Sequence, residues 1–325
     1  MKQGLDSITG QTALKELLNR SLSSGRISHA YILEGDLGMG KKTLAYAFAR
    51  QLVCENKSGC GICPHCRLAL SGNHPDIITV TPPEGKQNIS VDSIRALYES
   101  VMIKPFSADK KIIIIPGCEK MGPQAQNALL KMLEEPPSYV VFILLTSNSN
   151  YFLDTVLSRS IKLTMQPYTD SEIRSILAKN GHPDASETIV SCADGNAGKA
   201  LALISNDAFL SMRKELVSLF NLFFEDKPRV FDIISYFEAN KDFADDIFDI
   251  FLSFARELVF SHIGTENVSH SGDFPAADYI ERTTLKGTMA FLNIVIESKK
   301  MLLSNVNFTL LANSFVLSSR EVLGW

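Results

Sequence analysis

The chain has 325 residues and a mass of 35.9 kDa, more than a single hydrophobic core usually serves, so we expect two or three domains. Hydrophobic residues make up 45% and charged residues 21%, which excludes a largely disordered or fibrous protein. The net charge of −4 argues against autonomous nucleic-acid binding, and the apolar runs are too short for a membrane span. Because the N-terminus also lacks an apolar signal core, we expect a soluble, cytoplasmic protein.

The first half of the chain alternates predicted helices and strands. Apolar residues recur at helical spacing over 11–24, and a strand ending at Leu33 then meets a glycine turn and a second helix. Further strands are expected at 77–80, 111–115 and 140–146, and further helices at 91–102 and 123–133. Continuous apolar strands that alternate with helices predict an α/β domain whose parallel sheet is covered on both faces.

From residue 167 onward, almost every segment is predicted to be helical. Residues 169–181 predict a helix with Asp170 as its N-cap and Gly181 beyond its end. Residues 186–204 predict two short helices, and 206–325 several amphipathic ones. The charges are uneven, with 21 basic and 19 acidic residues in 1–205 but 11 and 17 in 206–325, so phosphate contacts are expected in the first part.

The segment after the first strand resembles a phosphate-binding loop. Gly35-Asp-Leu-Gly38-Met-Gly40-Lys41 matches the first seven positions of the Walker A pattern, in which backbone N–H groups and a lysine surround phosphates. The eighth position should be Ser or Thr to hold Mg²⁺ but is Lys42, and Thr43 lies about 100° further around a helix. We predict a degenerate nucleotide site formed by Gly35, Gly38, Gly40, Lys41 and Thr43, in which ATP binding is an open question.

The strand at 111–115 lacks the acidic residues that hydrolysis requires. One carboxylate normally holds Mg²⁺ and a second orients the attacking water. Here the strand runs into Pro116 and Gly117, and Glu119 is expected to lie too far along the chain to substitute easily. Because most of the electrostatic machinery is missing, we predict that the chain has no ATPase activity of its own.

Four of the six cysteines lie within thirteen residues. Cys54-x₅-Cys60-x₂-Cys63-x₂-Cys66 supplies four soft ligands at spacings suited to a tetrahedral zinc ion. A secreted disulfide framework would spread its cysteines more widely, and nothing here indicates the electron transfer of an iron–sulfur cluster. Since four thiolates leave no open position for water, we predict a structural zinc site in a small insert at about 54–66.

The other candidate ligands receive simpler interpretations. His65 and His74 could replace a cysteine, but we interpret them as exposed loop residues because four thiolates suffice. Cys118 and Cys192 stand alone and are predicted to be buried core thiols.

Several motifs in succession resemble one known family. HAYILEGDLGMGKKTLA, the four-cysteine insert, QNALLKMLEEPP at 126–137 and LSRS at 157–160 are similar to the delta-prime subunits of the bacterial DNA polymerase III clamp loader, which are AAA+ proteins. The likeness covers residues 1 to about 205, whereas the C-terminal third matches only in being helical. The resemblance implies an AAA+ P-loop core at 1–166, a small helical lid at 167–205 and an all-α collar at 206–325.

The family also implies partners and a role for one arginine. Its collar assembles five subunits, including gamma or tau and delta, into an open ring that loads a sliding clamp on primed-template DNA. A Ser-Arg-Cys loop presents its arginine to ATP on the adjacent subunit, and Ser158-Arg159-Ser160 matches except for the final serine. Such a finger can supply about 10³ to 10⁵ in rate, so Arg159 is the expected catalytic residue, acting in trans.

Lys199 falls where related ATPases place a lid arginine that senses nucleotide, and we include it in the degenerate site. The resemblance thus implies a largely non-hydrolysing stator of the clamp loader, with no membrane contact. One alternative is an active gamma-type clamp-loader ATPase that tolerates Lys42 and recruits Glu119. Another is a zinc-ribbon nucleic-acid-binding module on an inactive ATPase scaffold.

Overall fold

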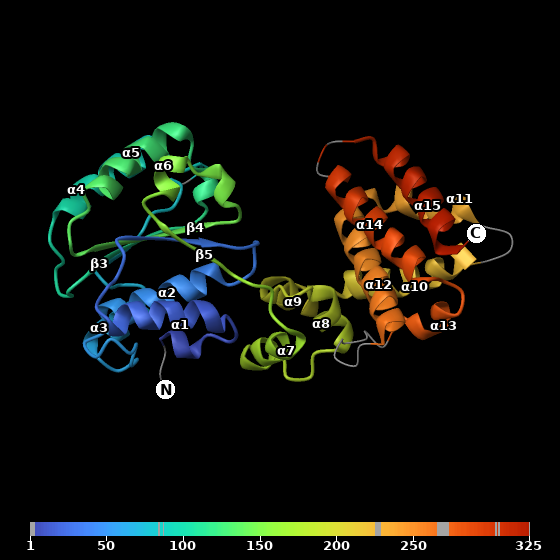
Figure 1. Cartoon of the computed structure of the whole chain (residues 1–325), viewed down its shortest axis with the longest axis horizontal. Helices are drawn as coiled ribbons and strands as arrows, with labels where there is room; N and C mark the ends of the chain where they lie inside the picture. Colours follow the sequence, from blue (N-terminus) through green and yellow to red (C-terminus); the bar gives the residue numbers. More distant parts are fainter. Residues whose placement is uncertain are drawn as a thin grey trace. The chain divides into compact units, whose positions relative to one another are not determined.

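The computed structural model describes residues 4–83, 85–86, 88–224, 229–264, 273–302, 304 and 306–324. The chain divides into two compact units, Met1–Tyr168 and Thr169–Trp325. The first unit is α/β and the second is helical (Figure 1). In the described part of the chain, no helix combines the length and the apolar character needed to cross a membrane.

A five-stranded parallel sheet forms the centre of the first unit. Its strands are β1 (Ala30–Glu34), β2 (Ile77–Thr79), β3 (Lys111–Ile115), β4 (Val140–Thr146) and β5 (Ile161–Thr164). They lie in the order β2-β3-β4-β1-β5, and β1 pairs with β4 in a register that sets Ile32 beside Leu144. All five carboxyl ends therefore meet at one edge of the sheet, where an open α/β fold places its ligand site.

Helices cover both faces of this sheet, as the apolar strands predicted (Figure 1). On one face lie α1 (Thr12–Ser23), α2 (Lys41–Val53) and α3 (Pro64–Leu70), and on the other lie α4 (Val91–Met102), α5 (Pro123–Glu134) and α6 (Asp154–Leu157). Short 3₁₀ turns occur at η1 (Leu5–Ser7), η2 (Cys118–Lys120) and η3 (Ser149–Tyr151).

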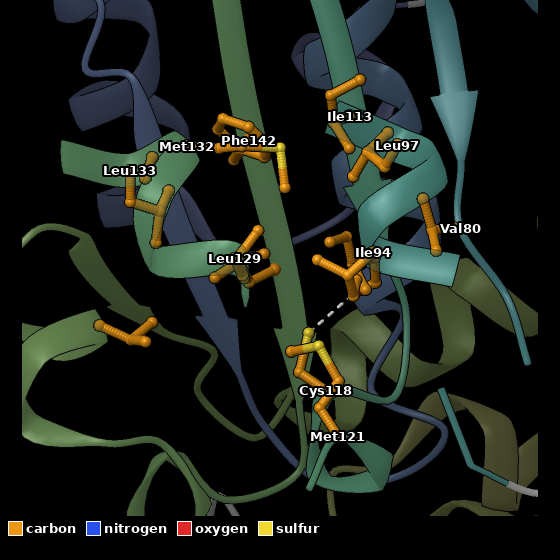
Figure 2. Close-up of a cluster of buried hydrophobic side chains, with 14 of the residues drawn as sticks. Val80, Ile94, Leu97, Ile113, Cys118, Met121, Leu129, Met132, Leu133 and Phe142 are labelled. Atoms are coloured by element: carbon orange, nitrogen blue, oxygen red, sulfur yellow. Dashed lines mark hydrogen bonds between the residues drawn. The ribbon is translucent and has the colours of Figure 1, made fainter. Parts of the chain in front are cut away.

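The two faces are packed by different side chains. Figure 2 shows Leu97 of α4 and Leu129 of α5 against Ile113 and Phe142 of the sheet, all of them buried. On the opposite face Tyr31 meets Phe48 of α2 edge to face, with ring centroids 5.4 Å apart. This three-layer arrangement confirms the expected α/β core with a parallel sheet.

The second unit contains nine α-helices within its described residues. They are α7 (Asp170–Lys179), α8 (Glu187–Ala193), α9 (Ala197–Ile204), α10 (Asp207–Phe220), α11 (Val230–Ala239), α12 (Ala244–Ile263), α13 (Ala276–Ile280), α14 (Leu285–Leu302) and α15 (Phe308–Gly324), with 3₁₀ turns η4 (Asn221–Phe224) and η5 (Lys241–Phe243). Phe220, Phe251, Phe254 and Phe291 form its aromatic core. The helical character predicted for this part is confirmed.

The start of α7 differs from the prediction. Thr169, and not Asp170, is the N-cap, because its hydroxyl accepts from the Glu172 backbone N–H at 3.3 Å. The Glu172 carboxylate accepts in return from the Thr169 backbone N–H at 2.9 Å. Asp170 therefore occupies the first helical turn, where its negative charge interacts favourably with the helix dipole.

Candidate functional site

The glycine loop connects β1 to α2 and requires two of its glycines. Gly38 and Gly40 have φ of 92° and 84°, in the left-handed region that L side chains rarely adopt. Gly40 is the N-cap of α2, so the free N–H groups of the first turn of that helix face the loop. Gly35 is closely packed, since an added Cβ would lie 3.2 Å from Cβ of Met165 and the neighbour would have to shift slightly.

The Lys41 side chain folds back on this loop. Its ammonium donates to the backbone carbonyl oxygen of Asp36 at 2.8 Å and also to that of Gly35. Burial lowers the pKa of Lys41, and the nearby carboxylates of Glu119 and Asp36 partly oppose this effect. Lys42 and Thr43, the next two residues of α2, are exposed.

A pocket of about 690 Å³ lies at the carboxyl edge of the sheet, where the glycine loop meets the ends of β3 and β4. Its lining residues are Leu37, Gly38, Gly40, Lys41, Lys42, Thr81, Pro82, Pro116, Gly117, Glu119, Lys120, Leu145 and Ser147. The pocket thus brings Gly38, Gly40 and Lys41 of the predicted site, but not Gly35 or Thr43, together with Pro116 and Gly117, the two positions where carboxylates belong in an active hydrolase. Pro116 and Gly117 instead line the pocket with uncharged atoms.

Glu119 reaches this pocket, although its distance along the sequence argued otherwise. Gly117 has φ of 68°, and this left-handed residue turns the chain into η2, which returns Glu119 to the pocket wall. The Glu119 carboxylate accepts from the Ser147 backbone N–H at 3.3 Å. A glycine before a short turn is the sequence signal that could have suggested this placement.

Arg159 lies on a separate part of the first unit, just after α6. One amino group of its guanidinium pairs with the Glu134 carboxylate at 3.2 Å. The other donates to the backbone carbonyl oxygen of Thr155 at 3.1 Å and approaches the Ser158 hydroxyl at 3.4 Å. The Arg159 side chain is 36% exposed, so solvent and a partner molecule can reach it.

Lys199 belongs to the helical unit, in the first turn of α9. The Asn196 side chain caps this helix by accepting from the Lys199 backbone N–H at 3.0 Å. The Lys199 ammonium pairs at 2.6 Å with Asp249 of α12, which also pairs with Lys299 of α14. The charge of Lys199 is therefore balanced inside the helical unit.

The four clustered cysteines form a metal-compatible site at the end of α2. The Sγ atoms of Cys54, Cys60, Cys63 and Cys66 all lie within 4.8 Å of one another, and those of Cys60 and Cys66 are 3.9 Å apart. Tetrahedral coordination with Zn–S bonds of about 2.3 Å places sulfurs about 3.8 Å apart, so the cluster fits one zinc ion. All four are free cysteines without disulfides.

Backbone geometry favours the thiolate form at Cys54 and Cys60, whereas burial raises the pKa of Cys66 well above its ordinary value. Cys63 caps α3, and its Sγ accepts from the Cys66 backbone N–H at 3.4 Å. Burial alone would raise the pKa of Cys54, but backbone N–H groups, that of Cys60 first, lower it to about 6. Ligand thiols must lose their protons before a metal binds, so these N–H groups prepare the site.

The interpretation of both histidines as exposed loop residues is wrong. His74 is only 3% exposed and His65 is partly buried. Their rings are joined by a hydrogen bond of 3.0 Å between His65 Nδ1 and His74 Nε2. His74 Nδ1 also accepts from the Asp76 backbone N–H at 3.0 Å, so the pair fastens the cysteine insert to the start of β2.

Cys118 and Cys192 are buried, as predicted. The Cys118 thiol donates to the Ile115 backbone carbonyl oxygen at 3.0 Å, within the cluster drawn in Figure 2. Cys192 lies 3.2 Å from the guanidinium of Arg213, which is fully buried in the helical unit. Neither thiol belongs to the metal-compatible cluster.

Comparison with known proteins relates this chain to subunits of DNA polymerase III. A family model described as "DNA polymerase III, delta subunit" matches residues 10–169. The chain is 30% identical to DNA polymerase III subunit delta' of Bacillus subtilis over 96% of both chains. It is 32% identical to the delta' subunit of Escherichia coli over 59% of each, and 31% identical to the Escherichia coli tau subunit over 62% of this chain and 32% of tau.

A solved structure of a DNA polymerase III gamma subunit-related protein from Thermotoga maritima aligns with 94% of this chain and 98% of its own, at 18% identity and a TM-score of 0.45. The sequence relationship to delta' of Bacillus subtilis extends over nearly the whole of both proteins. On that relationship, the chain belongs to the DNA polymerase III delta-prime family.

Proposed function

We propose that this chain is an accessory subunit of the DNA polymerase III clamp loader, where it assembles with tau or gamma and with delta to load the sliding clamp on primed DNA in the cytoplasm. The similarity to delta' over 96% of the chain, and to tau over its first part, supports this role. In this proposal residues 167–205 act as the lid and 206–325 as the collar that joins the ring.

The chain is proposed to be a non-hydrolysing member of that ring, and the residues that line the pocket are the main support for this proposal. Pro116 and Gly117 line the same pocket as Lys41, so neither position can hold Mg²⁺ or orient water. Glu119 offers one carboxylate, which already accepts from Ser147. A single engaged carboxylate cannot take both roles at once, so phosphate release should be very slow.

Nucleotide binding and phosphate release by the purified chain, with and without primed DNA, test this conclusion. We expect turnover close to the uncatalysed rate, whatever the affinity for ATP. Substantial turnover that disappears in Glu119→Gln would instead support the gamma-type ATPase. Lys120→Gln alters a neighbouring residue of the same pocket wall and is the matched control.

Arg159 is proposed to act on ATP held by an adjacent subunit. A planar guanidinium with several N–H donors suits the charge that spreads over a transferring phosphoryl group. Its partial exposure, on a turn held by backbone hydrogen bonds, supports this role. Lys199 is proposed to sense nucleotide. A nucleotide phosphate would have to compete with the Asp249 carboxylate for the Lys199 ammonium.

The cysteine cluster is proposed to hold structural zinc through Cys54, Cys60, Cys63 and Cys66. A bound zinc ion would cross-link the end of α2 to the start of α3. Four cysteine ligands complete a tetrahedral shell and leave no place for a reacting water molecule. The site therefore supports the fold of the insert and takes no part in phosphate chemistry.

A further inference from the structure

The Arg159 guanidinium is held against its own subunit by a carboxylate on α5. Glu134, the last residue of that helix, lies 3.2 Å from one amino group of Arg159. The Thr155 carbonyl oxygen and the Ser158 hydroxyl accept from the other amino group, and both belong to the same turn as Arg159. Glu134 is thus the contact that ties the guanidinium to a different element.

The backbone that carries Arg159 is fixed independently of this ion pair. Gln126, near the start of α5, is 2% exposed, and its amide donates to the Tyr151 carbonyl oxygen at 2.8 Å. The oxygen of the Gln126 side-chain amide accepts from the Leu153 backbone N–H at 2.8 Å. Val156 of α6 is also fully buried. Removing the Glu134 charge should therefore free the guanidinium without displacing the turn.

The ion pair is weak enough to be exchanged. Glu134 and Arg159 side chains are 51% and 36% exposed, and exposed pairs of this kind contribute about 0 to 1 kcal/mol. A triphosphate carries more negative charge than one carboxylate and can bind the guanidinium through two parallel hydrogen bonds. A phosphate brought close by a neighbouring subunit can therefore displace Glu134.

We propose that Glu134 is a positioning residue that holds the Arg159 guanidinium on α5 until the polyphosphate of a neighbouring subunit displaces it. This inference rests on the proposed role of Arg159 in trans. Glu134 competes with phosphate for the guanidinium, so its charge raises the ATP concentration at which the finger engages. It does not alter the reaction rate once Arg159 is engaged.

The test is ATP turnover, as a function of ATP concentration, by a clamp loader reconstituted from this chain with tau or gamma and delta. Glu134→Gln keeps the size of the side chain and removes its charge. Glu135→Gln, at the exposed position that follows, is the matched control. We expect the half-saturating ATP concentration to fall about two- to fivefold in Glu134→Gln, with maximal turnover unchanged, and to stay constant in Glu135→Gln.

The double variant Glu134→Gln/Arg159→Ala should behave as Arg159→Ala alone, because Glu134 acts through that arginine. Equal half-saturation in Glu134→Gln and Glu135→Gln would overturn the inference. A lower maximal turnover in Glu134→Gln would also overturn it, since the carboxylate would then be supporting the engaged finger.

A second measurement on the isolated chain separates this inference from the proposed function. The side-chain Nε–H signal of Arg159 in nuclear magnetic resonance, assigned with Arg159→Lys, reports rotation about the Nε–Cζ bond. We expect slower rotation in the wild type and Glu135→Gln than in Glu134→Gln. Unaltered turnover in Arg159→Ala would refute the trans role, whereas equal rotation in all three proteins would refute the restraint by Glu134.

Discussion

The Lys162 ammonium of β5 lies 2.7 Å from the carboxylate of Glu34, the last residue of β1 before the glycine loop. The same carboxylate accepts from the Ser149 backbone N–H at 2.6 Å. Burial alone would raise the pKa of Glu34, but Lys162 and Ser149 outweigh it and lower the pKa to about 2. The end of β1, the strand β5 and the turn η3 are thus joined through one ionised side chain.

We expect Glu34→Gln to lower the free energy of unfolding by about 1 to 2 kcal/mol at pH 7, because half-exposed Lys162 is partly screened by solvent. Because the pKa of Glu34 is lower in the folded state, its ionised carboxylate stabilises the fold fully at pH values above the ordinary pKa of 4.5. This contribution is lost as the pH falls towards 2. Urea unfolding of both proteins from pH 7 to pH 3 checks this. A difference that stays constant or widens on acidification would contradict the assignment.

The buried side-chain amide of Gln126 joins α5 to the segment that leads to Arg159 through hydrogen bonds to Tyr151 and Leu153, and it also donates to the Met121 backbone carbonyl oxygen. Gln126→Leu would leave two carbonyl oxygens and one N–H group without their partner, so we expect a loss of about 2 to 4 kcal/mol in unfolding free energy. Gln124→Leu, on the exposed side of the same helix, should change stability by less than about 0.5 kcal/mol. Similar losses in the two variants would show that the buried amide is not the cause.

Cys63→Ser should lose the metal, because serine replaces a thiolate ligand with a weak neutral one. We expect one zinc per wild-type chain by mass spectrometry of the purified protein, and none in Cys63→Ser. The insert of this variant should also be cleaved faster by protease. Cys118→Ala removes a buried thiol elsewhere and should retain the metal. Zinc-free wild-type protein, purified without chelators, would count against a zinc site.

Much of the first unit could be predicted because its central strands are continuous, mainly apolar runs in the sequence. The runs at 111–115 and 140–146 are apolar except for Lys111 and Thr146, and they form β3 and β4 with the predicted bounds. The helix at 91–102 also has the predicted bounds, since Ser90 is a good N-cap. Local pattern and burial agree in these segments, so no distant contact is needed to define them.

Other features depend on contacts that the sequence does not reveal. β5 is a four-residue edge strand with three exposed positions, and its pairing with β1 alone defines it. The helix α3 could not be predicted from the sequence, because it is seven residues long and begins at a cysteine cap. The placement of Glu119 follows from the left-handed turn at Gly117, and that of His74 from its bond to His65.

The most direct test of a non-hydrolysing subunit with a finger in trans compares two variants of this chain in the reconstituted loader. Arg159→Ala removes the proposed finger, and Lys41→Ala disables any site of the chain's own. We predict that DNA-stimulated ATP turnover falls severalfold with Arg159→Ala and is unchanged with Lys41→Ala. Unchanged turnover with Arg159→Ala, together with a loss in Lys41→Ala, would contradict the account.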